Sequence, residues 1–182
     1  ILVLGDLILD EFHWCEINRI SPEAPVPICQ VKSTTLAAGG AANVAANIAA
    51  LNAKVDLFGF IGNDQTGEKF LKVLKEKNIN NTGLIKTRRP TNLKSRIIAS
   101  QQHVVRVDRE ETSNYSALNY KKLYKLISKN IAQYQAVVLS DYLKGVLPAA
   151  FTKKIIQCAK QHNCIVIVDP KGHSFAKYSD AD

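Results

Sequence analysis

The sequence predicts an α/β fold: a doubly wound, mostly parallel sheet covered by helices on both faces, with a small β flap beside it. Three observations lead to this prediction. Strand-like and helix-like segments alternate along the 182 residues. The apolar strands end in aspartates, namely Asp6, Asp141 and Asp169. The segment after the first strand contains prolines, which are excluded from central strands.

The strands of the main sheet are apolar runs that end in turn residues. Residues 1–5 form a continuous apolar run ending in glycine, which is typical of a buried parallel strand. Further strands are predicted at 54–62 and 82–87, and two buried ones at 136–142 and 164–170. Ligands of such sheets bind beyond the carboxyl ends of the strands.

Four helices are predicted between these strands. The first is an alanine-rich helix at about 41–51, and the second covers 63–78 with Asp64 as its N-cap. The third, at 116–131, is amphipathic and has Ser116 as its N-cap. The fourth covers 148–162 with Pro148 in its first turn.

The flap is predicted from two stretches of short strands, at about 11–35 and 88–108. The first stretch contains strand-like segments on either side of the proline-rich "SPEAPVP". The second contains "NLKSRIIAS" and "HVVRVD", and turn residues lie between these two segments. We expect these strands to form a lid that projects from the main body.

Composition excludes several classes of protein. The chain is 46% hydrophobic and 22% charged, as in globular proteins, and no apolar run or leader pattern predicts a membrane helix or a secretory signal. The spacing of the four cysteines fits no metal site, so we predict no bound metal and a reducing, cytoplasmic location. The net charge is +8, but the basic residues are not interleaved with aromatic residues as in nucleic-acid-binding proteins. We therefore expect a phosphorylated small substrate and no nucleic acid.

The first strand leads into two candidate sugar ligands. Asp6 and Asp10 flank "LIL", and each carboxylate can accept hydrogen bonds from sugar hydroxyls. The alternative is that they are loop or capping acids. Gly39 and Gly40 precede the alanine-rich helix, where they allow a ligand to approach the backbone or form a tight turn. They match neither the dinucleotide-binding pattern nor the P-loop.

Two asparagines lie one turn apart on the alanine-rich helix. Asn43, in the first turn, is expected to point into the cleft. Asn47 is expected to be a structural amide with its hydrogen bonds satisfied.

Basic residues at strand ends are candidates for binding phosphate. Asp141 and Lys144 follow one buried strand, and Asp169 and Lys171 follow another, so all four are expected to border one crevice. Ordinary surface lysines are the alternative. Arg96 and Arg106 are expected near the flap, with Asp108 on the same face as Arg106. Phosphate binding and surface ion pairs are the two alternatives for these arginines.

Five segments together resemble the ribokinase-like (phosphofructokinase B-type) carbohydrate kinases. These segments are "VLGDLILD", "AAGGAANVAANIAAL", "GFIGNDQTG", "VLSDYLKG" and "VDPKG". The more specific "RISPEAPVP" and "LSDYLKG" are similar to the kinase domains of the bifunctional heptose 7-phosphate kinase and heptose 1-phosphate adenylyltransferase enzymes of Gram-negative bacteria.

The resemblance implies that ATP phosphorylates D-glycero-β-D-manno-heptose 7-phosphate at O1, in ADP-heptose and lipopolysaccharide core synthesis. It implies a three-layer α/β/α fold whose flap covers the sugar and pairs with that of a second subunit. The sugar ligands would be Asp6, Asp10, Gly39, Gly40 and Asn43. Arg106, Lys144 and Lys171 would lie near a phosphate, with Asp141 beside them.

In this family the catalytic aspartate, and the segment that organises ATP and Mg²⁺, lie toward the C-terminus. We therefore expect residues 1–182 to be the N-terminal portion of the kinase domain, with no catalytic base. The adenylyltransferase domain is expected to be absent, and the chain to be inactive alone.

Two other functions remain open. One is a ribokinase-like kinase for fructose, ribose or a nucleoside. The other is a non-catalytic module that binds a sugar phosphate or mediates dimerisation. A Rossmann dehydrogenase has the least support, because the first strand leads into Gly5-Asp6 and not into a glycine-rich phosphate loop.

Overall fold

Five parallel strands form the main sheet of the computed structural model, which describes residues 1–172 and 174–182. Their order across the sheet is β5-β4-β1-β8-β9. In chain order they are β1 (Leu2–Gly5), β4 (Asp56–Gly62), β5 (Asn80–Thr87), β8 (Ala136–Asp141) and β9 (Ile165–Pro170).

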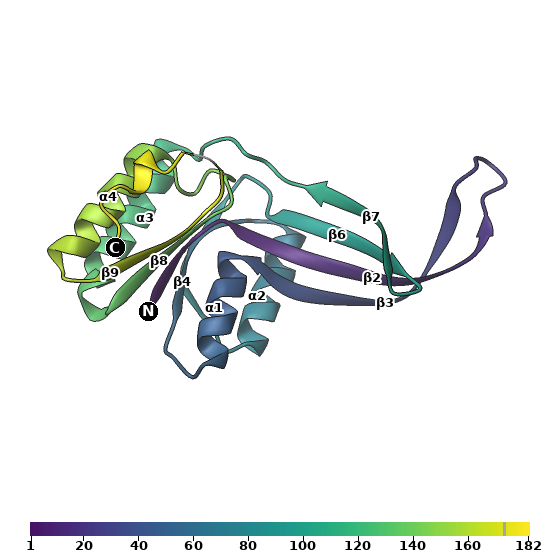
Figure 1. Ribbon diagram of the computed structural model, residues 1–182, viewed down its shortest axis with the longest axis horizontal. Coiled ribbons are helices and arrows are strands. Elements are labelled where there is room, and N and C mark those ends of the chain that lie inside the picture. Colours follow the sequence, from purple (N-terminus) through teal and green to yellow (C-terminus); the bar gives the residue numbers. More distant parts are fainter. Residues whose placement is uncertain (173) are drawn as a thin grey trace.

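Helices cover both faces of this sheet (Figure 1). Successive side chains of a strand point to opposite faces, so Val3 of β1 packs on one side while Leu2 and Leu4 pack on the other. The Val3 side contacts α1 (Ala41–Ala50) and α2 (Gln65–Glu76). The Leu2 side contacts α3 (Ala117–Asn130) and α4 (Ala149–Gln161). The predicted three-layer α/β/α architecture is confirmed.

A four-stranded second sheet forms the flap, which extends away from the helices (Figure 1). Its order is β3-β2-β6-β7, with β2 and β6 parallel and the other pairs antiparallel. The strands are β2 (Leu7–Ile20), β3 (Pro27–Gly40), β6 (Asn92–Ala99) and β7 (Gln102–Arg109). The first strand begins at Leu7, earlier than expected, so Asp10 lies within a flap strand.

Predicted helix starts agree with the local hydrogen bonds. The Asp64 side chain accepts a bond from the backbone N–H of Gly67 at 2.8 Å, which caps α2. Ser116 caps α3 in the same way, accepting from the N–H of Asn119 at 3.2 Å. Pro148 was expected in the first turn of α4 but is its N-cap, one residue before the observed first turn.

The predicted strand at 164–170 is present as β9, but within residues 1–182 it is only partly buried, unlike the fully buried strand that we expected. β9 lies at the edge of the sheet and pairs only with β8 among the described strands. Alternate side chains are therefore exposed, with Ile165 at 56% and Ile167 at 52%. Among the described residues, no helix is both long and apolar enough to cross a membrane.

Candidate active site

The candidate site lies where the chain passes between the main sheet and the flap. The chain does so at four places: Asp6, the Gly40–Ala41 junction, residues 88–91 and residues 110–116. We call these four passages together the flap base. Two of these passages follow the carboxyl ends of β1 and β5, the end of a parallel sheet where ligands bind.

Asp10 lies on β2, a few residues beyond the flap base, and 18% of its side chain is exposed. Arg96 of the neighbouring strand β6 donates from Nη1 to Asp10 Oδ1 at 2.5 Å. The Arg96 guanidinium also lies over the Phe12 ring, 5.1 Å from its centroid. These contacts fix the carboxylate at a partly open position, and it can still accept bonds from a ligand.

Because Gly39 has no side chain, the Asp10 carboxylate can occupy the space beside it. A Cβ at residue 39 would lie 2.4 Å from Asp10 Oδ2, closer than van der Waals contact allows. Gly40 has another role, because its φ of 58° lies in the left-handed region and it is the N-cap of α1. A Cβ there would lie 2.2 Å from the carbonyl oxygen of Asp6. The doublet therefore combines an open carboxylate with a sharp turn.

Helix α1 starts at this turn and buries its alanines. Ala41, Ala42 and Ala45 face the core, which lets the helix pack close to the sheet. Asn43 is exposed in the first turn, where its amide is accessible to a ligand. Asn47 is exposed as well, so the expectation of a satisfied structural amide is wrong at that position.

Asp6 is completely buried and differs from the open sugar ligand that we expected. Its carboxylate accepts three backbone N–H bonds, from Tyr142 at 2.8 Å, Lys144 at 3.0 Å and Val146 at 3.0 Å. Burial raises the pKa of Asp6, although these three bonds act in the opposite direction. This geometry favours a role in positioning the loop after β8, which we call the β8 loop, over direct contact with a sugar.

Asp141 is also buried and is occupied by protein groups. It accepts bonds from the Leu143 N–H at 2.8 Å and the Tyr178 hydroxyl at 2.6 Å, and it pairs with the Lys177 ammonium. Burial, and then the bond to Asp141, raise the pKa of Tyr178. Asp141 therefore anchors the short helix η2 (Ala176–Tyr178) to the end of β8. Nothing in the sequence pattern pointed to Lys177.

The structure does not bring Lys144 and Lys171 to one pocket. Lys144 Nζ donates to Glu110 Oε1 at 2.6 Å. Lys171 is exposed, 5.7 Å from the Tyr142 ring centroid, and lines a cavity of about 500 Å³ with Lys153 and Lys177.

Arg106 lies on the same flap face as Asp10. It is directly opposite Arg96 in the β6–β7 register, and 53% of its side chain is exposed. Its Nε donates to Asp108 Oδ1 at 2.9 Å, which confirms that these two residues share a face. Lys94 lies 3.8 Å from the other oxygen of Asp108. We call Asp10, Lys94, Arg96, Arg106 and Asp108 the charged flap face.

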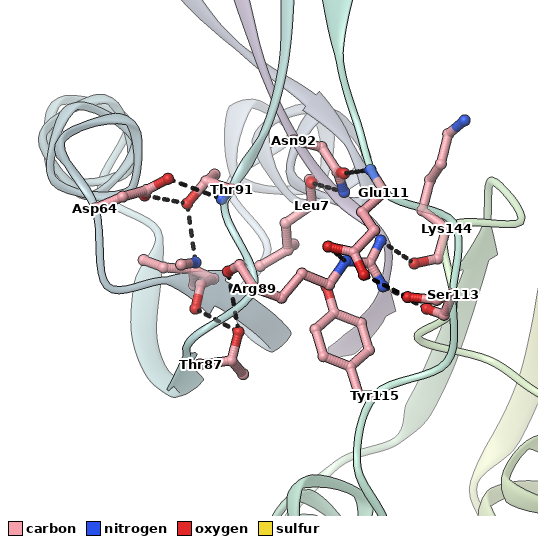
Figure 2. A network of polar contacts seen from close by, with 12 residues as sticks. Leu7, Asp64, Thr87, Arg89, Thr91, Asn92, Glu111, Ser113, Tyr115 and Lys144 are labelled. Carbon is pink, nitrogen blue, oxygen red and sulfur yellow. Dashed lines mark hydrogen bonds and ion pairs between the residues drawn. The ribbon is translucent and has the colours of Figure 1, made fainter.

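Arg89 joins the flap base to the β8 loop (Figure 2). It donates to the carbonyl oxygens of Ser113 at 2.5 Å and Lys144 at 2.8 Å. Its guanidinium lies 4.3 Å from the centroid of the Tyr115 ring, and burial raises the pKa of Tyr115 to about 12 although Arg89 opposes this shift. Arg89 directly precedes Pro90 in the chain, and no local sequence pattern indicated this role.

Two further side chains hold the passages of the flap base together (Figure 2). Asn92 donates to the Leu7 carbonyl and accepts from the Glu111 N–H, both at 3.3 Å. Asp64, besides capping α2, accepts bonds from the N–H of Thr91 at 3.0 Å and its hydroxyl at 2.8 Å. The flap base is therefore a continuous hydrogen-bonded network.

Comparison with known proteins agrees with this architecture. The family model "pfkB family carbohydrate kinase" matches residues 2–181. The chain is 46% identical over all 182 residues to the "Bifunctional protein HldE" of Helicobacter pylori (strain HPAG1), and it spans 39% of that protein's length.

Two solved structures share the fold. A putative phosphofructokinase from Staphylococcus aureus matches with a TM-score of 0.76 and 15% identity, over 94% of this chain and 54% of that one. Phosphofructokinase-2 from Escherichia coli, solved with substrates and products, matches with a TM-score of 0.71 and 17% identity, over 99% of this chain and 56% of that one.

Proposed function

Because the chain belongs to the pfkB family of carbohydrate kinases, we propose that the full-length protein uses ATP to phosphorylate heptose 7-phosphate at O1. The product is the 1,7-bisphosphate of D-glycero-β-D-manno-heptose, an intermediate for ADP-heptose and lipopolysaccharide core. One observation carries this choice of substrate: the 46% identity to HldE extends over the whole chain.

The site supports this function through the groups at the base of the flap. Asp10 accepts hydrogen bonds from sugar hydroxyls while Arg96 holds its carboxylate in place. Gly39 keeps that carboxylate close to the backbone, and Asn43 offers an amide to another hydroxyl. These contacts would hold the sugar in one orientation, which lowers the entropic part of the barrier to phosphate transfer.

The phosphate of the substrate requires cationic groups near the same place. Arg106 on the charged flap face and Lys144 on the β8 loop are the candidates with the best access to the flap base. Lys171 lies in a separate cavity and is the weaker candidate. A guanidinium suits a phosphate because it donates two parallel bonds.

ATP and Mg²⁺ are the cofactors of this reaction, and the described residues do not fit a Mg²⁺ site. Among them, no group of three or more His, Cys, Asp or Glu side chains comes together to hold a metal ion. The buried acids Asp6 and Asp141 are occupied by protein donors. We assign ATP and Mg²⁺ to the remainder of the full-length protein, and propose that residues 1–182 alone transfer no phosphate.

We also propose a homodimer formed through the flap, in the cytoplasm. The flap exposes apolar side chains that a second copy would cover, among them Val31, Val105 and Val107. The four cysteines are free, as expected for a reducing compartment. Sedimentation of the full-length protein tests the dimer, and Val105→Lys together with Val107→Lys should convert it to a monomer.

A substrate panel tests the proposed reaction. The purified full-length protein is given ATP and Mg²⁺ with heptose 7-phosphate, unphosphorylated heptose, fructose 6-phosphate, ribose or a nucleoside. We expect the highest kcat/KM with heptose 7-phosphate and a product with a second phosphate on O1, identified by phosphorus NMR. A preference for an unphosphorylated sugar, or no turnover with any substrate, would contradict the proposal.

A further inference from the structure

The Lys144 carbonyl takes part in the contacts drawn in Figure 2, while the Lys144 side chain points away from them. The backbone N–H of Lys144 donates to the buried carboxylate of Asp6 at 3.0 Å, and its carbonyl accepts from Arg89 at 2.8 Å. The Lys144 ammonium is therefore the part of this residue that can change partners without moving the β8 loop.

The present partner of that ammonium is Glu110, at 2.6 Å from Oε1. Glu110 directly follows β7, so it starts the segment that leads from the flap back to α3. The contact therefore joins the outermost strand of the flap to the β8 loop. Solvent screens the attraction between the two charges only in part, because 10% of the Lys144 side chain and 27% of the Glu110 side chain are exposed.

We propose that Lys144 and Glu110 form an electrostatic latch, and that the phosphate of a bound sugar competes with Glu110 for the Lys144 ammonium. A phosphate carries more charge than a carboxylate and offers more acceptor oxygens, so it can displace Glu110. Displacement removes one of the contacts that hold residues 110–116, so this segment opens more often and the flap is less firmly tied to the main sheet. The identity of the phosphorylated sugar rests on the proposed function, whereas the latch rests on the contacts of Lys144 and Glu110.

Glu111 provides a matched control, because it neighbours Glu110 but does not contact Lys144. Its Oε1 accepts the Ser113 hydroxyl at 2.5 Å, its Oε2 lies 4.0 Å from Arg89 Nε, and 48% of its side chain is exposed. Glu110→Gln and Glu111→Gln remove the same charge at adjacent positions. Only the first removes the latch.

Hydrogen exchange of the full-length protein tests the latch. The reporter is the N–H group of Tyr115, which donates to the Tyr120 hydroxyl at 3.1 Å and is not adjacent to either substituted residue. In wild-type protein, inorganic phosphate or heptose 7-phosphate should accelerate exchange at this amide. Glu110→Gln should show fast exchange without ligand and little further change on adding phosphate, while Glu111→Gln should behave like wild type.

Affinity gives a second and independent readout. Without its competitor, Lys144 should bind inorganic phosphate about three- to ten-fold more tightly in Glu110→Gln, and Lys144→Gln should abolish this gain. Exchange and phosphate affinity in Glu110→Gln that equal those of Glu111→Gln would overturn the latch. If heptose 7-phosphate does not bind but inorganic phosphate still releases the latch, the proposed function fails and the latch stands.

Discussion

Arg96 and Arg106 lie directly opposite each other on β6 and β7, with their side chains on the same face of the flap. Like charges in this arrangement repel, and the structure places an acid beside each one. Asp10 binds Arg96, and Asp108 binds Arg106. The two arginines therefore differ in role, because only Arg96 holds the proposed sugar ligand.

Replacing each arginine separately should reveal this difference. Arg106→Gln should weaken the binding of heptose 7-phosphate by about ten-fold, through loss of one charged hydrogen bond, and leave unphosphorylated heptose unaffected. Arg96→Gln should weaken the binding of both sugars, because Asp10 loses its partner. Calorimetric titration of the full-length variants measures both affinities.

Lys32→Gln serves as the control for these variants. It removes an exposed ion pair of the flap, in which Lys32 Nζ lies 3.0 Å from Glu16 Oε2, away from the charged flap face. An effect of Lys32→Gln as large as that of Arg106→Gln would show that flap charge in general, and not Arg106, determines the affinity.

Substitutions of Gly39 and Gly40 should affect different properties, one the sugar affinity and the other the stability of the fold. Gly40→Ala adds a Cβ against a backbone carbonyl at a left-handed residue, so it should lower the free energy of unfolding by at least about 2 kcal/mol. Gly39→Ala instead presses on the Asp10 carboxylate, a side-chain group that can move if it gives up its bond to Arg96. It should cost less stability and reduce sugar affinity more. Urea unfolding and calorimetry distinguish the two, and equal effects on both properties would contradict these roles.

Asp6→Asn should destabilise the protein strongly while leaving the shape of the residue unchanged. The carboxylate accepts three backbone N–H bonds in a buried site, and an amide supplies only one acceptor oxygen there. We expect a loss of about 2–4 kcal/mol in the free energy of unfolding. Asp169→Asn is the control, because this acid of β9 is exposed and, among the described residues, accepts only the Ser140 hydroxyl, at 3.3 Å, a bond that the amide oxygen can keep. A stable Asp6→Asn variant with weakened sugar binding would instead support direct contact of Asp6 with the sugar.

Glu11 should make the attachment of the flap depend on pH. It accepts bonds from Lys69 of α2 at 3.2 Å and from Ser95 of β6 at 3.0 Å. Burial acts to raise the pKa of Glu11, but these bonds and the charges of Lys69 and His13 outweigh it and hold the pKa below its ordinary value of 4.5. Its stabilising contribution is therefore present above pH 4.5 and disappears as the pH falls through the lowered pKa.

Comparing wild type with Glu11→Gln isolates this contribution. The difference in their free energies of unfolding should shrink between about pH 7 and about pH 3. The same measurement on Glu23→Gln, at an exposed residue between β2 and β3, should show no such change. A difference that grows on acidification would contradict the assigned direction of the pKa shift.

Much of the fold could be predicted from local patterns. Apolar runs that end in aspartate predicted β1, β8 and β9, and Asp64 and Ser116 predicted two helix starts, because these signals act within a few residues. The place of β9 in the strand order of residues 1–182 could not be predicted in the same way. The run "CIVIV" is equally apolar at the edge and in the centre of a sheet, and the order of the strands decides which residues are covered.

The sequence identified candidate residues near the strand ends, but it did not identify their surroundings. Asp6 and Asp10 look alike in the sequence, yet one is buried by the β8 loop and the other lies on the flap strand β2. Three backbone donors 136 to 140 residues away determine the role of Asp6, and no local pattern encodes them. Glu110 and Arg89 were missed for the same reason, since their partners come from a loop far along the chain.

The account depends most directly on Asp10 as the ligand of a phosphorylated sugar. Calorimetric titration of heptose 7-phosphate into full-length wild type and Asp10→Asn tests it, because asparagine keeps the shape and removes the charge. We predict specific binding by the wild type and at least about ten-fold weaker binding by the variant, with an unchanged free energy of unfolding within about 1 kcal/mol. Equal affinity of the two proteins, or no binding by the wild type, would contradict the account.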